Sequence, residues 1–228
     1  MNVKQKLADP TNYRAGRTKS IKCIVVHYTA NNGDTALGNA NYFANNKNLQ
    51  ASAHYFVDEN EAYQSVPDTD TAWHCGADTT YKHAECRNAN AIGIELCSRK
   101  DSAGNYYFAD ATVENAIELV KAKMKEHGVS IGNVLRHYDV TGKNCPAPFV
   151  QNESLWTAFK AKLIEGVIDM ALDTWQKEGG QAAITALVKK GLIDKPENWN
   201  TEKALAANVP SYLFWMMMNR LAEYKGGK

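Results

Sequence analysis

The sequence predicts an α/β protein in which a mixed central β-sheet is flanked by helices, with a small all-helical domain at the C-terminus. Short β-branched runs alternate with longer amphipathic stretches, which is the pattern of a sheet covered by helices. Two of the runs are close enough in sequence to pair as a hairpin, so we expect a mixed sheet. After residues 165–173 the strand-like runs stop and only short helix-like segments follow.

The first half of the chain supplies most of the predicted strands. Residues 21–28 form a short β-branched run that predicts a buried strand, with His27 at its carboxyl end. A helix is predicted over residues 35–46, where Gly33-Asp34 marks its start. The predicted hairpin consists of strands at 52–58 and 62–66, joined by the turn Glu59-Asn60-Glu61.

The second half alternates strand and helix after a polar loop over residues 67–90. Residues 91–97 predict a strand with Glu95 near its end. Apolar residues recur at helical spacing over residues 110–124, and that helix ends toward Gly128. The remaining predicted elements are a strand at 134–137, which delivers His137, and a helix at 155–168.

The composition of the chain limits the kinds of molecule that the protein is expected to bind. The chain has 228 residues, 44% hydrophobic and 22% charged, with a formal net charge of +1 and a pI of about 7.6. Such a balance predicts neither a nucleic-acid partner nor an anionic membrane surface. The N-terminus lacks the apolar segment of a signal peptide and no stretch is long enough for a membrane span, so we expect synthesis in the cytoplasm. Composition leaves the oligomeric state open.

The cysteines do not predict a disulfide framework. Their number is odd and their spacing is unpaired, although Cys75 and Cys86 can in principle close a loop. Cys145 differs because it follows His137 by eight residues, with Gly142 in a turn between them. With His27, these two residues outline a zinc site of three ligands and one position for water. Taken singly, a strand-end histidine is more often structural, and a buried cysteine commonly packs as a small hydrophobe.

Five segments, in the same order along about residues 20–165, resemble segments of one known enzyme family. They look like the zinc-dependent N-acetylmuramoyl-L-alanine amidases of the type-2 group, which includes phage lysozymes of this activity, bacterial autolysins and animal peptidoglycan recognition proteins. A chance match in one segment means little, whereas five in order are specific. The segments are Ile24–Thr29, Ser52–Asp58, Ala72–Gly76, Asn88–Glu95 and Arg136–Pro146.

The resemblance implies a catalytic domain at residues 1–168, with peptidoglycan as the substrate. It assigns Zn²⁺ to His27, His137 and Cys145, and implies hydrolysis of the amide between N-acetylmuramic acid and L-alanine. Asp can replace the cysteine in some family members, and recognition proteins that have lost it generally bind without cutting, so the presence of Cys145 favours an enzyme. The alternatives are a non-catalytic peptidoglycan-binding protein and an amidase that recycles soluble muropeptides.

Glu95 and Lys143 are the predicted catalytic residues. An acidic residue in the apolar run Ile92–Leu96 is costly to bury without a partner, and its position agrees with the resemblance, so we expect Glu95 to act as the general base. Lys143 matches a position where relatives carry a catalytic lysine, and a cation there stabilises an oxyanion. Without the resemblance, a solvated strand-end charge and a surface lysine are the ordinary interpretations.

Four further residues are predicted to contact the substrate. Some relatives have a catalytic tyrosine where this chain has His54, so the division of roles between Glu95 and His54 stays open. Trp73 and His74 are expected to form a wall for the sugar or stem peptide, although a core tryptophan is equally common. Asn88 matches a position near the substrate in relatives. His83 and His127 lack such support and are expected at the surface.

Residues 169–228 are predicted to form the helical domain. They faintly resemble the S-layer-homology type of repeat, which favours a cell-wall-binding module. A helical subdomain that stabilises the catalytic domain or mediates self-association is the alternative. The combination favours a phage or prophage endolysin, made in the cytoplasm and acting on the cell wall after release.

Overall fold

The computed structural model describes residues 3–77, 80–164, 182, 185–186 and 188–190. The chain divides into two units, Met1–Leu163 and Ile164–Lys228. The predicted helices of residues 169–228 and the predicted boundary at residue 168 fall almost wholly outside the described residues. Within the described part of the chain, no helix combines the length and the apolar character needed to span a membrane.

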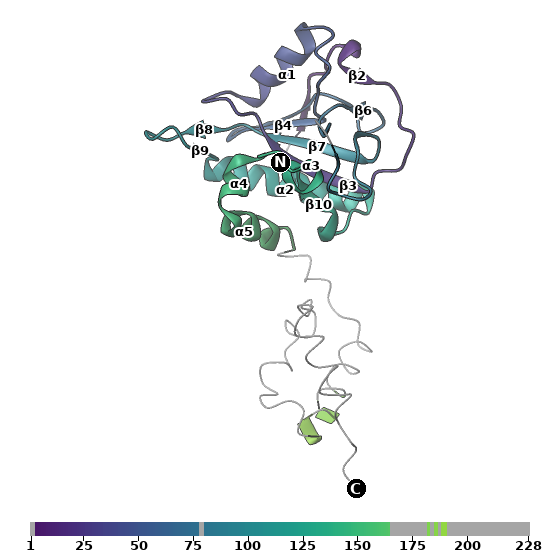
Figure 1. Cartoon of the computed structure of the whole chain (residues 1–228), viewed down its shortest axis with the longest axis vertical. Coiled ribbons are helices and arrows are strands. Elements are labelled where there is room, and N and C mark those ends of the chain that lie inside the picture. The colour runs from purple at the N-terminus through teal and green to yellow at the C-terminus, as the bar shows by residue number, and fades with distance from the viewer. Residues whose placement is uncertain (1–2, 78–79, 165–181, 183–184, 187, 191–228) are drawn as a thin grey trace. The chain divides into compact units, whose positions relative to one another are not determined.

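The first unit is an α/β fold built on a six-stranded mixed sheet, which confirms the predicted fold class (Figure 1). Short 3₁₀ turns cover Pro10–Asn12, Asn88–Asn90 and Ile131–Asn133. The strands are β1 (Val3–Gln5), β2 (Tyr13–Arg14), β3 (Cys23–Tyr28), β4 (Tyr55–Val57), β5 (Ala62–Gln64), β6 (Thr71–Ala72), β7 (Ala91–Leu96), β8 (Arg99–Lys100), β9 (Tyr106–Tyr107) and β10 (Val134–Arg136). The helices are α1 (Ala36–Asn45), α2 (Asp110–His127), α3 (His137–Thr141), α4 (Ala147–Gln151) and α5 (Glu153–Ile164).

The sheet has the order β1-β5-β4-β7-β3-β10. Strands β4, β7, β3 and β10 are mutually parallel. The β4–β5 hairpin is antiparallel and β1 pairs parallel to β5, so the predicted hairpin is what makes the sheet mixed. Two short antiparallel pairs, β2–β6 and β8–β9, lie outside the main sheet.

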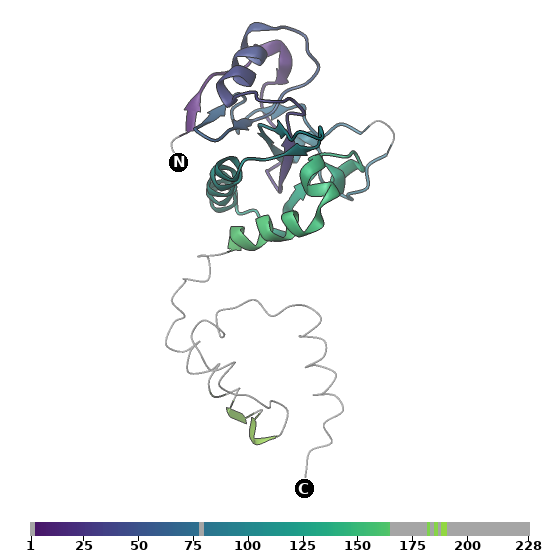
Figure 2. The same cartoon turned by 90° about the vertical axis from the view of Figure 1, so that its left-hand side faces the viewer.

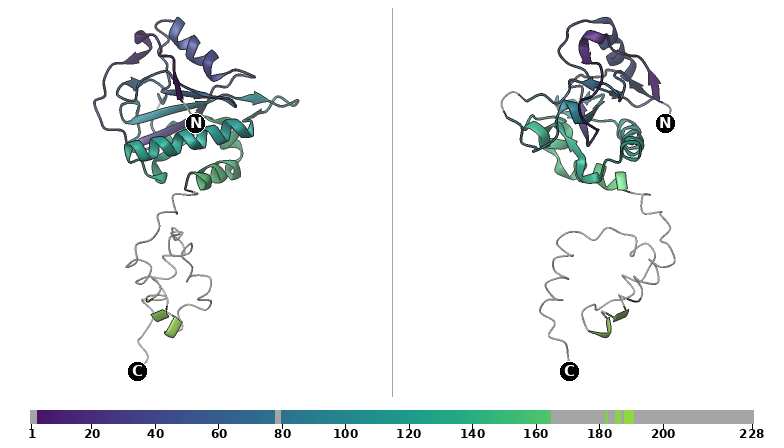
Figure 3. Two further views of the ribbon diagram at one scale, coloured as in Figure 1. Left: turned by 180° about the vertical axis from the view of Figure 1, so that it is seen from behind. Right: turned by 90° about the vertical axis from the view of Figure 1, so that its right-hand side faces the viewer.

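Helices cover both faces of the sheet. Helix α2 packs against one face, where alternate residues of β3, β4 and β7 join the helix in the largest apolar core. Helix α1 lies on the opposite face with Phe56 and Tyr63 (Figure 2). The view from behind shows α2 as the long teal helix that crosses the sheet (Figure 3, left). Because side chains alternate along a strand, the face away from α2 is left for His27, Gly93 and Glu95.

Several predicted elements differ from the structure at their ends. Strand β4 begins at Tyr55, and the hairpin partner β5 ends at Gln64. Helix α1 begins at Ala36, because the Thr35 hydroxyl accepts the N–H of Gly38 and forms the N-cap. Helix α2 continues past the predicted Met124 to a cap at Gly128, which is left-handed as expected.

The prediction missed the shortest elements. The predicted loop at residues 67–90 contains β6. The segment that follows β10, residues 137–151, contains α3 and α4. These elements have two to five residues, which is too short for a periodic apolar pattern to form. His137 therefore begins α3 instead of ending a strand.

Candidate active site

Three parallel strands bring the central residues to one edge of the sheet. His27 on β3 pairs in register with Glu95 on β7, and His137 follows β10 directly. The carboxyl ends of parallel strands meet at the same edge, so these three side chains converge. Ligand and catalytic sites of open α/β sheets are commonly at this edge.

Cys145 reaches the same place through a turn. Gly142 ends α3 with φ of 88°, and the N–H of Tyr138 donates to the carbonyl of Cys145 across 2.8 Å. The chain thus folds back, and the Cys145 Sγ lies 3.6 Å from the Nδ1 of His27. The predicted approach of the thiol to the imidazoles is confirmed.

The donor atoms of His27, His137 and Cys145 all lie within 4.8 Å of one another. All three residues are buried, with exposed fractions of 1%, 3% and 4%. The two imidazole rings are 4.8 Å apart between centroids. Two imidazole nitrogens and one thiol sulfur form a donor set that suits Zn²⁺, and three protein ligands leave a position open for substrate or water. The residues present therefore fit a catalytic zinc ion.

Burial keeps His27 and Cys145 of this donor set neutral when no metal is bound. Burial lowers the pKa of His27 well below its ordinary value, and the nearby His74 and His137 lower it further. Burial also raises the pKa of the Cys145 thiol to about 12, with a contribution from the charge of Glu95. A metal that binds here displaces the thiol proton, so affinity is expected to fall as pH falls.

Glu95 lies beside the donor set, and one of its two carboxylate oxygens has no hydrogen-bond partner within the described part of the chain. Its Oε2 is buried and makes no hydrogen bond within the described residues, while the residue is partly open to the cavity. Burial raises its pKa to about 8; the charge of Lys143 opposes this shift and that of Asp34 adds to it. A carboxyl group with a pKa near neutrality can both take and return a proton.

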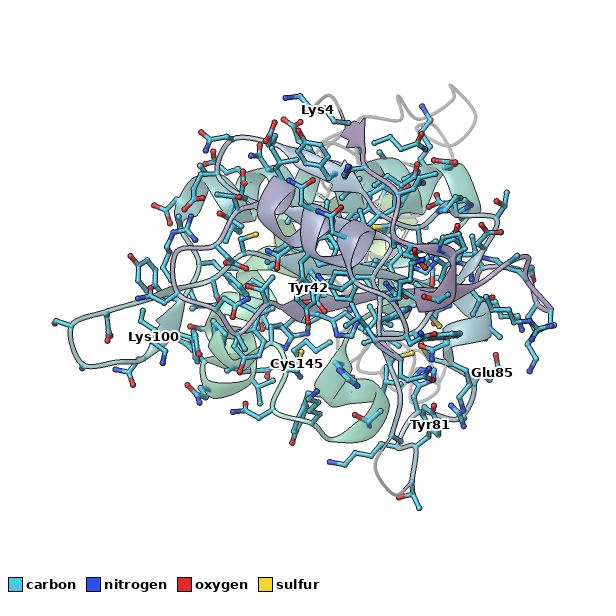
Figure 4. The ribbon with its side chains drawn as sticks, turned by 90° about the horizontal axis from the view of Figure 1, so that it is seen from above. Lys4, Tyr42, Tyr81, Glu85, Lys100 and Cys145 are labelled. Carbon is cyan, nitrogen blue, oxygen red and sulfur yellow. The ribbon has the colours of Figure 1, made fainter. Side chains whose placement is uncertain are left out.

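A cavity of about 760 Å³ opens over these residues. Its floor contains the predicted ligands and Glu95, the exposed Lys143 lies at its rim, and its far wall is the exposed side of α1, including Tyr42 (Figure 4). Tyr42 is 53% exposed, and Gly38 lies one turn before it on the same wall. The prediction did not include these α1 residues.

Two of the four predicted substrate residues line this cavity. Trp73 and His74 form part of its wall, and His74 Nδ1 lies 3.0 Å from His27 Nε2. Asn88 instead lies behind them: its Oδ1 accepts the backbone N–H groups of His74 and Cys75 at 3.1 and 2.8 Å. Its hydrogen bonds thus shape the backbone, and it does not line the cavity.

His54 also lies beneath the cavity instead of lining it, which corrects the predicted position. The side chain is fully buried. Its Nδ1 accepts the N–H of Gly93 at 2.9 Å, and its Nε2 is 2.7 Å from Arg17 Nη2. The alternation along β4 is as expected, since Tyr55 points to the other face and contacts Asp68. Only Glu95 of the two candidate bases faces the cavity.

His83 and His127, predicted at the surface, are each partly exposed and hydrogen-bonded. His83 Nδ1 accepts the N–H of Cys86 at 3.0 Å. His127 is 17% exposed in its side chain, and its Nε2 lies 2.9 Å from Asp68 Oδ2. His83 is held by a local turn, and His127 is held by a residue far away in sequence. The residue type alone does not predict either hydrogen bond.

Comparison with known proteins agrees with this geometry. N-acetylmuramoyl-L-alanine amidase CwlL of Bacillus licheniformis is 40% identical over 203 residues, covering 84% of this chain and 55% of the relative. BlyA of Bacillus subtilis, also an N-acetylmuramoyl-L-alanine amidase, is 35% identical over 159 residues, or 64% of this chain and 42% of the relative. The chain thus spans about half the length of these relatives.

Solved structures give the same picture. The catalytic domain of XlyA superposes with a TM-score of 0.59 at 32% identity, covering 72% of this chain and 99% of that domain. PlyL superposes with a TM-score of 0.59 at 30% identity, covering 72% and 97%. Residues 17–148 match the family described as N-acetylmuramoyl-L-alanine amidase. The chain therefore belongs to the N-acetylmuramoyl-L-alanine amidase family.

Proposed function

We propose that this protein hydrolyses the amide between N-acetylmuramic acid and L-alanine in peptidoglycan, with Zn²⁺ held by His27, His137 and Cys145. The observation that carries this proposal is the position of Glu95. Its Oε2, which has no partner among the residues that the structure describes, shares one cavity with three buried zinc-type ligands. Membership of the amidase family supports the choice of bond.

The chain's own residues divide the reaction among them. Zinc, when bound, supplies a Lewis acid for the scissile carbonyl and for the attacking water. Glu95 accepts the proton of that water and passes it to the nitrogen of the leaving L-alanine. Lys143 is exposed at the cavity rim, where its ammonium group stabilises the negative oxygen of the tetrahedral intermediate. Trp73 and the α1 wall provide surfaces for the sugar and the stem peptide.

The decisive experiment identifies the bond that is cut. Purified cell walls are digested with the full chain, and the new end groups are labelled. Freed amino groups of L-alanine are the expected result, and zinc removal by a chelator should stop their release. Freed reducing sugars in place of amino groups would contradict the proposal, as would digestion that persists in metal-free protein.

We also propose that the protein acts as an endolysin whose residues 169–228 bind the cell wall. Matches to Bacillus amidases and to a structure described as an endolysin from Bacillus subtilis support this setting. The catalytically impaired Glu95→Gln chain should sediment with walls, and further replacement of Trp175 and Trp199 by alanine should release it. Unchanged sedimentation would contradict a wall-binding role for those tryptophans. Faster cleavage of soluble muropeptides than of walls would favour recycling.

A further inference from the structure

Both ligand histidines turn their outer nitrogen toward one short segment, His74-Cys75-Gly76. His27 Nε2 lies 3.0 Å from the Nδ1 of His74. His137 Nε2 lies 3.3 Å from the carbonyl oxygen of Gly76. The segment thus contacts the far side of both rings, although it is about 50 to 60 residues from either histidine in sequence.

The partners determine which nitrogen carries hydrogen. A carbonyl oxygen only accepts hydrogen bonds, so Nε2 of His137 is the protonated nitrogen and Nδ1 keeps its lone pair. His27 Nδ1 faces the Cys145 sulfur at 3.6 Å, which makes it the nitrogen on the ligand side. Its Nε2 then carries hydrogen and donates to His74 Nδ1. In both rings the hydrogen on Nε2 leaves the lone pair for a metal on Nδ1.

The segment is itself held from behind. Asn88 Oδ1 accepts the backbone N–H groups of His74 and Cys75, and also contacts the Cys75 thiol at 3.2 Å. The ring of His74 lies against Gly93, where a Cβ atom would come within 2.5 Å of the His74 Cγ. A glycine at this buried position of β7 is therefore needed for the ring to reach His27.

We propose that His74 and Gly76, positioned by Asn88 and Gly93, form the outer shell of the metal site and fix the orientation of His27 and His137. The inference rests on the zinc site of the proposed function. It reassigns His74 and Asn88 from the substrate to the ligands. Outer-shell partners of histidine ligands typically contribute about 10- to 100-fold to metal affinity.

Zinc affinity of the full chain tests this directly, without substrate. Metal-free protein is titrated with zinc in competition with a chromophoric chelator. His74→Ala should raise the zinc Kd about 10- to 100-fold, whereas His74→Gln, whose amide oxygen can accept from His27 Nε2, should recover most of the affinity. Trp73→Phe is the matched control, because Trp73 lines the same cavity and, among the described residues, no hydrogen bond joins it to His27 or Cys145, so the zinc Kd of this variant should stay unchanged.

A second pair of variants, at Asn88, distinguishes a loss of ligand positioning from a loss of the folded state. Asn88→Asp keeps an acceptor for both N–H groups and should retain affinity, while Asn88→Ala should lose about 10-fold. Cobalt-substituted His74→Ala should show an altered visible absorption spectrum, because the ligand geometry changes. Wild-type affinity and spectrum in His74→Ala, with weaker binding to walls, would overturn the inference and return His74 to the substrate. Absence of zinc binding in the wild-type chain would instead refute the proposed function.

Discussion

Two polar clusters of this protein, one buried and one half-buried, contain similar residue types but differ in whether a positive charge already lies beside their carboxyl group. The first is the zinc-site cluster of His27, His137, Cys145 and Glu95. The second, the Asp68 cluster, joins Asp68 to Tyr55, Lys123 and His127 through hydrogen bonds of 2.7 to 2.9 Å. Each contains three potential ligand atoms within 4.8 Å of one another, with Glu126 completing the second set.

In the Asp68 cluster, the ammonium group of Lys123 already lies beside the carboxylate. Burial raises the pKa of Asp68, but hydrogen bonds from Lys123, Tyr55 and His127 outweigh burial and leave the pKa below its ordinary value. In the zinc-site cluster, burial raises the pKa of Glu95 to about 8, and Oε2 has no partner among the described residues. The difference teaches that close ligand atoms do not by themselves make a metal site. A cation site also needs ligand atoms whose charge is not already balanced by a positively charged side chain of the protein.

The largest effect is expected from a substitution that removes a ligand from the zinc-site cluster. Cys145→Ser replaces the thiol with a hydroxyl, a much poorer zinc ligand, so zinc and hydrolysis should be lost together. We expect the metal content to fall to background and the rate to drop by at least about 10³-fold. Metal analysis and the release of L-alanine amino groups measure the two. Asp68→Asn is the control from the other cluster and should retain zinc.

Glu95→Ala should separate chemistry from metal binding. The three ligands remain, so zinc content should be unchanged, while the rate should fall about 10²- to 10⁴-fold because the proton acceptor is gone. Steady-state rates on cell walls at saturating zinc provide the measurement. Full activity in Glu95→Ala would move the base role to another residue and remove the main distinction between the two clusters.

Asp68→Asn should affect stability and leave the zinc site alone. The substitution removes the charge that Lys123 faces at 2.9 Å, although Glu126 still contacts that ammonium group at 2.8 Å. We expect a loss of about 2–3 kcal/mol in the free energy of unfolding, less than for a fully abandoned buried charge. Chemical denaturation with zinc bound measures it. Equal stability would show that the Asp68 cluster is electrostatically neutral to folding.

The smallest effect concerns pH in the metal-free protein. A carboxyl whose pKa is raised from 4.5 to about 8 holds its proton in the folded state after the unfolded state has lost it. Stability from this group is therefore full below about pH 4.5 and is lost as pH rises toward 8. Glu95→Gln removes that loss, so the variant should gain about 1–2 kcal/mol over the wild type at pH 8.

The difference between Glu95→Gln and the wild type should shrink toward pH 5, which thermal unfolding at both values can measure. Bound zinc should also reduce it, because a nearby cation favours the ionised carboxylate. An advantage that stays constant with pH would mean that Glu95 is ionised throughout and that the zinc-site cluster has an unseen partner.

Much of the fold was predictable because the long elements have strong local patterns. Strands β3 and β7 and helix α2 follow from β-branched runs, helical spacing and Gly128 at the helix end. The paired strands β8–β9, two residues each, and the five-residue α4 were not predicted. Their existence depends on contacts with distant segments, which no local pattern records.

For the site, the sequence alone predicted the residues that carry the chemistry: His27, Glu95, His137 and Cys145 are singled out by residue type, by their place near strand ends and by the resemblance to amidases. The tertiary structure decided which neighbours face them. It placed His54 beneath the cavity and Asn88 behind His74, and it brought the carbonyl of Gly76 to His137. These positions depend on strand order and on close packing at Gly93, and packing joins residues irrespective of their separation along the chain.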